Sequence, residues 1–241
     1  MVQYVDCITP ANNIKIAALG RLKGRPSKLL VIRDGDREDD GFFLRGIQKD
    51  AIELGIDVKL YNELEQYTDG ILYLGEPKDF PMARLDVDGM SADAPRIRAV
   101  AAAAMTVIDE YGPVEGKKAV VVGRGIGKQI FDELLKRNAT VSICHSKTSH
   151  DTLVQELRSA DIVVTVARGV EIPSSDIGDG ALCVDIGRNI VVAEDDTREG
   201  DASIRLTPRK NGIGLITRAI LLNRVAYNCD IRNSRPIPYE L

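Results

Sequence analysis

The chain has 241 residues, of which 44% are hydrophobic and 28% are charged, so it can form a packed core and is not a disordered protein. The 32 basic and 36 acidic residues give a net charge of −4, which argues against a general nucleic-acid binder and against a polybasic membrane anchor. The alanine-rich run at residues 99–108 is too short to span a bilayer. Residues 1–10 have neither the basic start nor the apolar core of a secretory signal, so we expect a cytoplasmic protein without a membrane partner.

The four cysteines lie far apart in the sequence, with no CxxC pair and no paired His/Cys spacing. This pattern predicts buried reduced thiols rather than a zinc site or a disulfide framework. We therefore expect no metal in this protein.

Short β-rich runs alternate with amphipathic stretches along the chain, which is typical of an α/β protein with mainly parallel sheets. In the first part of the chain, the pattern predicts a strand, a helix and two further strands, at residues 28–33, 41–54, 57–61 and 70–74. A loop-like region at residues 76–94 then leads to a helix that begins near Pro95 and ends near Tyr111. We place a domain transition at this helix.

The second part of the chain contains a βαβ unit, with a strand, a helix and a strand at residues 118–123, 127–136 and 140–144. Two more apolar strands are predicted at residues 161–165 and 181–185. The last amphipathic stretch, residues 214–228, predicts a helix.

The turn between the first strand and the helix of this βαβ unit has the pattern GxGxG. Glycines allow a tight turn and let backbone amides approach a pyrophosphate at the positive end of a helix. The spacing differs from GxGxxG, and a tight βα turn needs glycine with or without a ligand. Because an intact βαβ unit surrounds the turn, we interpret it as a nucleotide site formed by Gly123, Arg124, Gly125, Ile126 and Gly127.

The end of the second strand distinguishes between two dinucleotides. NAD sites place a carboxylate there, which binds the ribose hydroxyls. Here the strand is followed by His145, Ser146 and Lys147, and no carboxylate occurs before Asp151. A hydroxyl and a cation, together with Arg124, suit a 2′-phosphate, so we predict NADP as the cofactor and NAD as the second choice. We interpret His145 as a packing or hydrogen-bonding residue at the rim of this cofactor site.

Several segments of the chain resemble those of the methylenetetrahydrofolate dehydrogenase/cyclohydrolase family. They are LDVDG (residues 85–89), GKKAVVVGR (116–124), NATVSICHSKT (138–148), ADIVV (160–164), GALCVDIG (180–187) and GIGLIT (212–217). The similarity covers roughly residues 29–228 and is more specific in the second half of the chain.

The resemblance implies two α/β domains with a cleft between them, usually assembled as a homodimer. It implies a folate-type substrate domain at residues 1–112, on which a C-terminal helix at residues 214–241 packs. Residues 113–213 would form a Rossmann-like NAD(P)-binding domain. The implied reaction is oxidation of 5,10-methylenetetrahydrofolate by hydride transfer to a nicotinamide, and many members of the family also hydrolyse the methenyl product.

Matching positions in the family assign further roles. Arg124, Ser146 and residues 125–127 would hold the dinucleotide, although the glycine loop is shorter than is usual in the family. Gly212 and Gly214 would close over the substrate. Asp88 would meet the pterin, because a carboxylate can pair with adjacent N–H donors; alternatively, it caps a turn.

The sequence departs from the family where hydrolysis would take place. Phe43 stands at the position of the family's tyrosine, and Ile47 stands at that of its acid/base lysine. Leu74 replaces a supporting glutamine, and Lys49 matches only a second lysine. Hydrolysis of a methenyl cation needs water activation and proton transfer, which apolar side chains cannot perform, whereas hydride transfer depends mainly on positioning. We therefore predict a dehydrogenase with weak or absent cyclohydrolase activity.

Three alternatives remain open at the level of sequence. The same scaffold could act as an NAD(P)-dependent oxidoreductase on a different imine-type substrate. It could bind a nucleotide or folate without turnover. It could also be bifunctional, with Lys49 or another group in place of the missing lysine.

Overall fold

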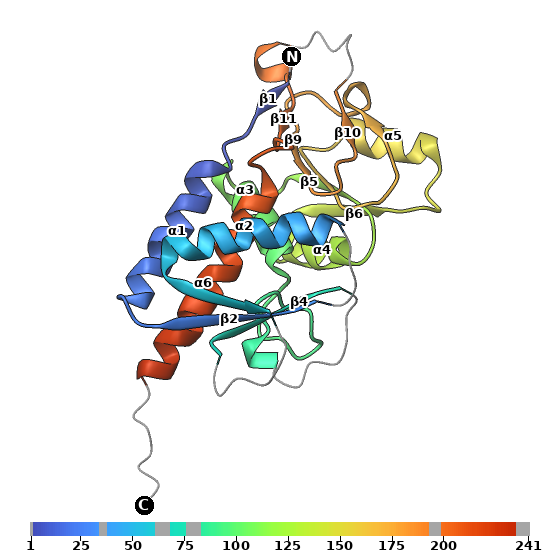
Figure 1. Ribbon diagram of the computed structural model, residues 1–241. Coiled ribbons are helices and arrows are strands. Elements are labelled where there is room, and N and C mark those ends of the chain that lie inside the picture. The colour runs from blue at the N-terminus through green and yellow to red at the C-terminus, as the bar shows by residue number, and fades with distance from the viewer. Residues whose placement is uncertain (1, 34–37, 61–67, 76–82, 193–198, 235–241) are drawn as a thin grey trace, which may run out of the picture. The chain divides into compact units, whose positions relative to one another are not determined.

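The computed structural model describes residues 2–33, 38–60, 68–75, 83–192 and 199–234. The chain forms two compact α/β units (Figure 1). The six-stranded unit comprises residues 1–10 and 100–213, and the three-stranded unit comprises residues 11–99 and 214–241.

The six-stranded unit is built on a parallel sheet with the strand order β1-β11-β9-β7-β5-β6. The strands are β1 (Gln3–Tyr4), β5 (Lys118–Val122), β6 (Thr140–Cys144), β7 (Ile162–Thr165), β9 (Leu182–Asp185) and β11 (Arg205–Leu206). The accompanying elements are α3 (Ala99–Glu110), α4 (Ile126–Lys136), α5 (His150–Arg158), η2 (Ser174–Asp176), η3 (Gly200–Ala202) and the paired strands β8 (Ile172–Pro173) and β10 (Ile190–Val191).

The central strands of this sheet are continuous apolar runs, because both faces of a parallel sheet are covered. Val120, Val163 and Cys183 are completely buried in one cluster. The strand order reverses at β5, which pairs with β6 on one side and with β7 on the other. The predicted strands of the second half and the predicted βαβ unit are confirmed.

The three-stranded unit has a parallel sheet with the order β3-β2-β4. Its elements are α1 (Ile8–Leu22), β2 (Ser27–Arg33), α2 (Glu38–Leu54), β3 (Ile56–Leu60), β4 (Gly70–Leu74), η1 (Ala83–Leu85) and α6 (Ile213–Ser234). Leu29 of β2, Ile47 of α2 and Leu222 of α6 are completely buried in a shared apolar cluster. Residue 61 of a predicted strand and residues 76–82 of the predicted loop lie outside the described residues.

The division of the chain differs from the expected one in two places. It falls at residues 99/100 rather than after Gly112, so nearly all of α3 belongs to the six-stranded unit. The first ten residues also belong to that unit, because β1 pairs with β11, with Gln3 opposite Arg205. A strand of two residues shows no alternation that a sequence pattern could reveal.

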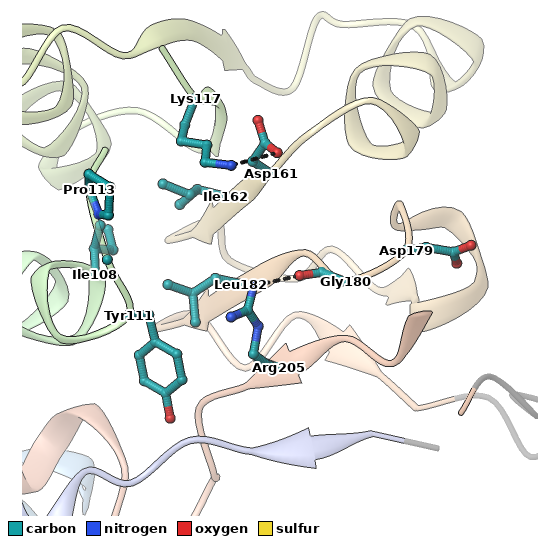
Figure 2. A pocket seen from close by; sticks show the side chains of 11 residues that line it. Ile108, Tyr111, Pro113, Lys117, Asp161, Ile162, Asp179, Gly180, Leu182 and Arg205 are labelled. Carbon is teal, nitrogen blue, oxygen red and sulfur yellow. Dashed lines mark hydrogen bonds and ion pairs between the residues drawn. The ribbon is translucent and has the colours of Figure 1, made fainter. Parts of the chain in front are cut away.

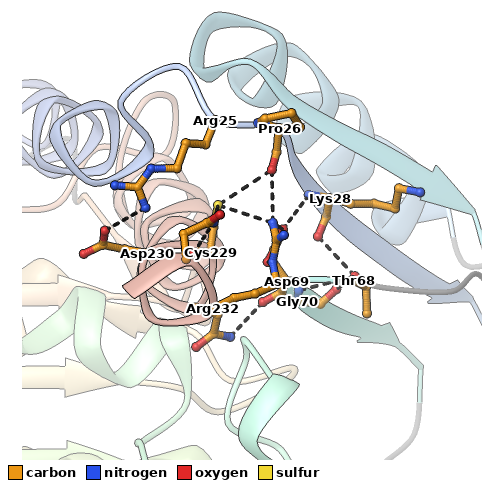
Figure 3. A network of polar contacts seen from close by, with 11 residues as sticks. Arg25, Pro26, Lys28, Thr68, Asp69, Gly70, Cys229, Asp230 and Arg232 are labelled. Atoms are coloured by element: carbon orange, nitrogen blue, oxygen red, sulfur yellow. Dashed lines mark hydrogen bonds and ion pairs between the residues drawn. The ribbon is translucent and has the colours of Figure 1, made fainter. Parts of the chain in front are cut away.

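Polar contacts tie α6 to the sheet of the three-stranded unit (Figure 3). Arg232 donates from Nε to Asp69 Oδ1 at 2.8 Å and from Nη2 to Asp69 Oδ2 at 3.2 Å. Asp69, which immediately precedes β4, also accepts the backbone N–H of Lys28 at 3.1 Å. A carboxylate as buried as Asp69 is tolerated because it is paired and hydrogen-bonded, so α6 is an integral part of this unit.

Two further features concern the whole of the described chain. Among its residues, no helix has both the length and the apolar character that a membrane span requires. The four cysteines are buried and free, and in the described ranges no three His, Cys, Asp or Glu side chains gather into a metal site.

Candidate functional site

The loop that follows β5 begins with a conformation that only glycine fits. Gly123 has a φ of +120°, and a Cβ on it would lie 2.7 Å from Val166 Cγ2 and 2.8 Å from the Ala167 nitrogen. Because Val166 and Ala167 follow β7, the loops at the carboxyl ends of β5 and β7 lie against each other. In an open parallel sheet, ligands bind at this edge, where the strand order reverses.

Gly125 leaves the positive end of α4 accessible. It is the N-cap residue, with φ 61° and ψ −111°, and no side chain of the described residues caps the helix. A Cβ on Gly125 would meet nothing within 4 Å, so its backbone borders open space. Gly127 is buried, and a Cβ there would lie 3.1 Å from Val121 Cγ1, so this glycine permits close packing of α4 on β5. Together these features fit the pyrophosphate of a dinucleotide, which needs close approach to the backbone at a helix N-terminus.

A tight turn follows the neighbouring strand β6 at the same edge. The N–H of Thr148 donates to the carbonyl of His145 at 2.8 Å, and the N–H of His145 donates to Thr148 Oγ1 at 2.9 Å. His145 Nδ1 accepts the N–H of Lys147 at 3.2 Å. This hydrogen bond gives His145 a role in shaping the turn.

The turn and the glycine loop are adjacent. The N–H of Gly123 donates to the carbonyl of Cys144 at 2.8 Å, where β5 and β6 end together. Arg124, Ser146 and Lys147 are all exposed at this edge. The structure therefore brings the predicted hydroxyl and cations to neighbouring strand ends, and their role in binding a 2′-phosphate stays a prediction.

A buried polar network that the sequence analysis missed supports the same edge. Asp185, the last residue of β9, accepts the hydroxyl of Thr165 at 2.6 Å and the N–H of Asn189 at 2.7 Å. Thr207 Oγ1 accepts the N–H of Asp185 at 2.9 Å. The network links the ends of β7, β9 and β11, and an aspartate that ends an apolar strand is the signal that could have revealed it.

A pocket lies at the opposite, amino edge of the six-stranded sheet (Figure 2). Lys117 faces Asp161 across it at 3.6 Å, while Arg205 donates to the carbonyl of Gly180 at 2.8 Å and lies over the ring of Tyr111. None of the predicted site residues lines this pocket. Because its lining residues lie at the amino ends of the strands, the pocket is separate from the candidate cofactor edge at their carboxyl ends.

In the three-stranded unit, the three residues that are predicted to stand at the positions of the family's hydrolytic residues contact the apolar core. Ile47 is fully buried, Leu74 is buried at the end of β4, and Phe43 packs against the same cluster while partly exposed. Lys49 is exposed on α2. A water-activating side chain is therefore not found at position 43, 47 or 74.

The sequence analysis missed a charged cluster beside these positions. Asp50 is buried and accepts from Lys15 Nζ at 2.7 Å and from Arg218 Nε at 2.7 Å. Gly46 makes room for this arrangement, because a Cβ on it would lie 2.9 Å from Arg218 Nε. An aspartate next to the buried stripe of α2 is the only local signal of this cluster, since Arg218 comes from α6.

Two aspartates organise the loop that leads towards α3. Asp86 Oδ1 accepts the N–H of Asp88 at 3.1 Å and that of Gly89 at 2.8 Å, so Asp86, and not Asp88, caps the turn before Gly89. Asp88 Oδ2 accepts from Arg98 Nε at 2.9 Å, and Arg98 Nη2 lies 2.7 Å from the same oxygen. Asp88 Oδ1 accepts the N–H of Ala99, the first residue of α3, at 3.2 Å.

A partly buried arginine holds this loop in place. Arg224 of α6 donates to the carbonyls of Val87 and Ile97, at 2.9 Å each, and so joins the two sides of the segment that ends at α3. Burial lowers the pKa of Arg224 to about 10, while Asp88 and Asp86 oppose that shift. The guanidinium is therefore still charged at neutral pH and contributes positive potential around Asp88.

The predicted closing loop lies just before and within the first turn of α6. Gly212 is buried, and a Cβ on it would collide with the carbonyl of Pro208. Gly214 has open space around its Cβ position. The two glycines differ in this respect, and contact with a substrate stays a prediction for both.

Comparison with known proteins gives a consistent match over these segments. The sequence model described as "Tetrahydrofolate dehydrogenase/cyclohydrolase, NAD(P)-binding domain" matches residues 98–233, more than half of the chain. The bifunctional protein FolD of Carboxydothermus hydrogenoformans is 29% identical over 276 aligned positions, covering 92% of this chain and 96% of that protein. The bifunctional protein FolD of Thermodesulfovibrio yellowstonii is 42% identical over 133 residues, covering 50% of this chain and 45% of that protein.

Solved structures show the same fold. The bifunctional FolD methylenetetrahydrofolate dehydrogenase/cyclohydrolase from Campylobacter jejuni superposes with a TM-score of 0.78 at 24% identity, covering 96% of this chain and 100% of that one. A 5,10-methylenetetrahydrofolate dehydrogenase from the silkworm Bombyx mori gives 0.77 at 23% identity, covering 98% and 100%. The predicted fold class, two α/β domains of which the second is Rossmann-like, is confirmed.

Proposed function

Because this chain belongs to the tetrahydrofolate dehydrogenase/cyclohydrolase family, we propose that it is a 5,10-methylenetetrahydrofolate dehydrogenase that transfers hydride to NADP in one-carbon metabolism. The observation that carries the proposal is the glycine loop at the N-terminus of α4, at the point where the strand order reverses. We also propose, from the family resemblance, a cytoplasmic homodimer.

The six-stranded unit supplies the cofactor site in this proposal. Backbone amides at the start of α4 bind the pyrophosphate, with Gly125 leaving room for it. The exposed side chains of Arg124, Ser146 and Lys147 bind the 2′-phosphate by charge-assisted hydrogen bonds. When bound, NADP supplies the nicotinamide C4 that accepts the hydride.

The three-stranded unit supplies the substrate site. Asp88 is nearly buried and lies in a loop fixed by Asp86 and Arg224, so its carboxylate is well placed to bind the N–H donors of a pterin. Hydride transfer then depends on how the substrate is oriented, and it needs no proton donor from the chain.

The same geometry supports the loss of hydrolysis. Attack of water on a methenyl cation needs a group that takes a proton, and Ile47, Phe43 and Leu74 cannot do this. Arg218 is the nearest cation to Gly46, but a guanidinium does not give up its proton at neutral pH. The methenyl product therefore leaves without being hydrolysed by the enzyme.

The first test is a steady-state assay of the purified protein with 5,10-methylenetetrahydrofolate and either NADP or NAD. We expect reduction of NADP at a higher kcat/KM than NAD. We also expect methenyl product to accumulate in equal amount, because the side chains of Phe43, Ile47 and Leu74 cannot activate water. Methenyl is followed directly by its own absorbance at the pH of the assay, because acid would convert the formyl product of hydrolysis back to methenyl, and a protein-free sample is the control for spontaneous hydrolysis.

Other outcomes select among the alternatives. Methenyl that decays faster than in the protein-free sample identifies a bifunctional enzyme. Turnover of another imine but not of methylenetetrahydrofolate identifies a different substrate. Binding of NADP without reduction on any of these substrates identifies a non-catalytic binder, and the proposed activity is then wrong.

A second prediction concerns the choice of cofactor. Lys147→Gln is expected to raise KM for NADP about fivefold and to leave KM for NAD unchanged, because an exposed charge–phosphate contact contributes about 1 kcal/mol. Lys136→Gln is the matched control, since Lys136 is an exposed lysine at the other end of α4, paired with Glu133 at 2.7 Å. Equal effects of the two substitutions would contradict the assignment of Lys147 to the 2′-phosphate.

A further inference from the structure

The carboxylate of Asp88 already has most of its hydrogen-bonding capacity in use. Oδ2 faces both Nε of Arg98, at 2.9 Å, and Nη2 of Arg98, at 2.7 Å. Oδ1 accepts the N–H of Ala99 at 3.2 Å. A carboxylate oxygen has about two lone pairs, so Oδ2 is filled and Oδ1 has one acceptor site left.

A pterin presents two parallel donors, N3–H and the 2-amino group, which together need both oxygens of a carboxylate. Asp88 cannot offer both oxygens while Arg98 holds Oδ2. We infer that Arg98 is a specificity-determining residue that competes with the pterin for Asp88 and is displaced from Oδ2 when the pterin binds. This inference rests on the proposed function, in which Asp88 is the pterin anchor.

The surroundings allow the exchange. The side chain of Arg98 is 24% exposed and can swing towards water, whereas that of Asp88 is 12% exposed and lies in a fixed loop. Asp86 holds the turn through the N–H groups of Asp88 and Gly89, and Arg224 holds Val87. None of these contacts involves Arg98, so these contacts remain when Arg98 leaves Oδ2.

A second arginine, Arg224, also lies near Asp88. Arg224 is close enough to Asp88 for the carboxylate to oppose the lowering of its pKa, and it stays protonated at neutral pH. Its positive charge therefore stays near Asp88 when Arg98 leaves. Without Arg98, a nearly buried carboxylate lacks its main donors, and a pterin would replace them.

The test is Arg98→Met, which keeps an unbranched stem but has no donor. We expect the Kd for tetrahydrofolate, measured by calorimetry, and the KM for methylenetetrahydrofolate to fall about fivefold, with the change in KM rather than in kcat. The matched control is Arg25→Met, which breaks another arginine–aspartate pair of the same unit, Arg25–Asp230 at 3.1 Å (Figure 3). It is expected to leave both constants unchanged.

A double-mutant cycle shows whether Arg98 acts through Asp88. In the Asp88→Asn background, Arg98→Met is expected to change Kd by less than about twofold, because the competition no longer exists. An unchanged Kd in Arg98→Met, or the same change with and without Asp88→Asn, would overturn the inference. If Arg98→Met does not fold, Arg98→Lys replaces it, with an expected tightening of about twofold to threefold because lysine holds the carboxylate at one point.

The outcomes also separate this inference from the proposed function. Wild-type protein that binds tetrahydrofolate but does not reduce NADP would contradict the function, and the cycle would still decide the role of Arg98. Wild-type protein that turns over, with Kd insensitive to Arg98, would keep the function and remove the inference. Wild-type protein that does not bind tetrahydrofolate overturns both.

Discussion

Gly125→Ala is expected to weaken NADP binding at least about tenfold while the protein remains folded. The added methyl group meets no protein atom within 4 Å, so it projects into the space that the pyrophosphate would fill. The backbone values of φ 61° and ψ −111° are unfavourable for alanine and cost about 1–3 kcal/mol of stability. Calorimetric titration with NADP, together with thermal unfolding, measures the two effects separately.

Gly116→Ala is the control for the backbone cost. Gly116 has a φ of +72°, also has open space at its Cβ position, and precedes β5, whose other end leads to the glycine loop. We expect it to lower the thermal midpoint without changing NADP affinity. Unchanged NADP affinity in Gly125→Ala would show that the dinucleotide does not approach this backbone, and the cofactor site would then have to lie elsewhere.

Ile47→Lys is expected to destabilise the protein by at least about 3 kcal/mol and not to produce cyclohydrolase activity. Ile47 is completely buried among apolar side chains, and the nearest carboxylate on its helix, Asp50, is already paired with Lys15 and Arg218. A lysine placed there has no water and no partner for its charge. Denaturant unfolding and the methenyl decay assay measure the two expectations.

The pH dependence of the stability of Ile47→Lys shows whether the new lysine is buried. Burial lowers the pKa of the lysine in the folded protein below its unfolded value of about 10.4, so the unfolded state binds more protons between these two values. The free energy of unfolding of the variant therefore rises with pH in that window, and its difference from the wild-type protein becomes smaller. Ile52→Lys adds the same charge at a side chain that is 79% exposed and should show neither effect. A stable Ile47→Lys variant that hydrolyses methenyl would contradict the structural account.

Much of the six-stranded unit around the glycine loop could be predicted from sequence, because the signals in the sequence are local. The strand that ends at Val122, the glycines at 123, 125 and 127, and the helix that follows occupy one continuous segment. Each glycine has its own physical reason, whether a positive φ, a close contact or tight packing on β5. The hydrophobic periodicity and the turn-forming glycines of such a segment predict its structure without knowledge of the rest of the chain.

The three-stranded unit was less predictable, because its polar contacts join segments that are distant in the sequence. Arg218 meets Asp50 across 168 positions in the sequence, and Arg224 reaches Val87 across 137. Neither pairing has a periodic signal, since each arginine on α6 looks like an ordinary surface residue until the helix is placed. The pairing of Arg98 with Asp88 spans only ten positions, but irregular backbone connects them and no sequence rule fixes its shape.

The interleaved course of the chain has a consequence for the order of folding. The three-stranded sheet is synthesised well before α6, yet its apolar cluster is completed by Leu221, Leu222 and Val225 of that helix. The six-stranded sheet likewise pairs Gln3 with Arg205. Contacts between segments so far apart in sequence slow folding and leave apolar surface uncovered until α6 has been synthesised. A ribosome stalled before α6 would therefore carry a nascent chain with an open core, and such a chain is a substrate for chaperones.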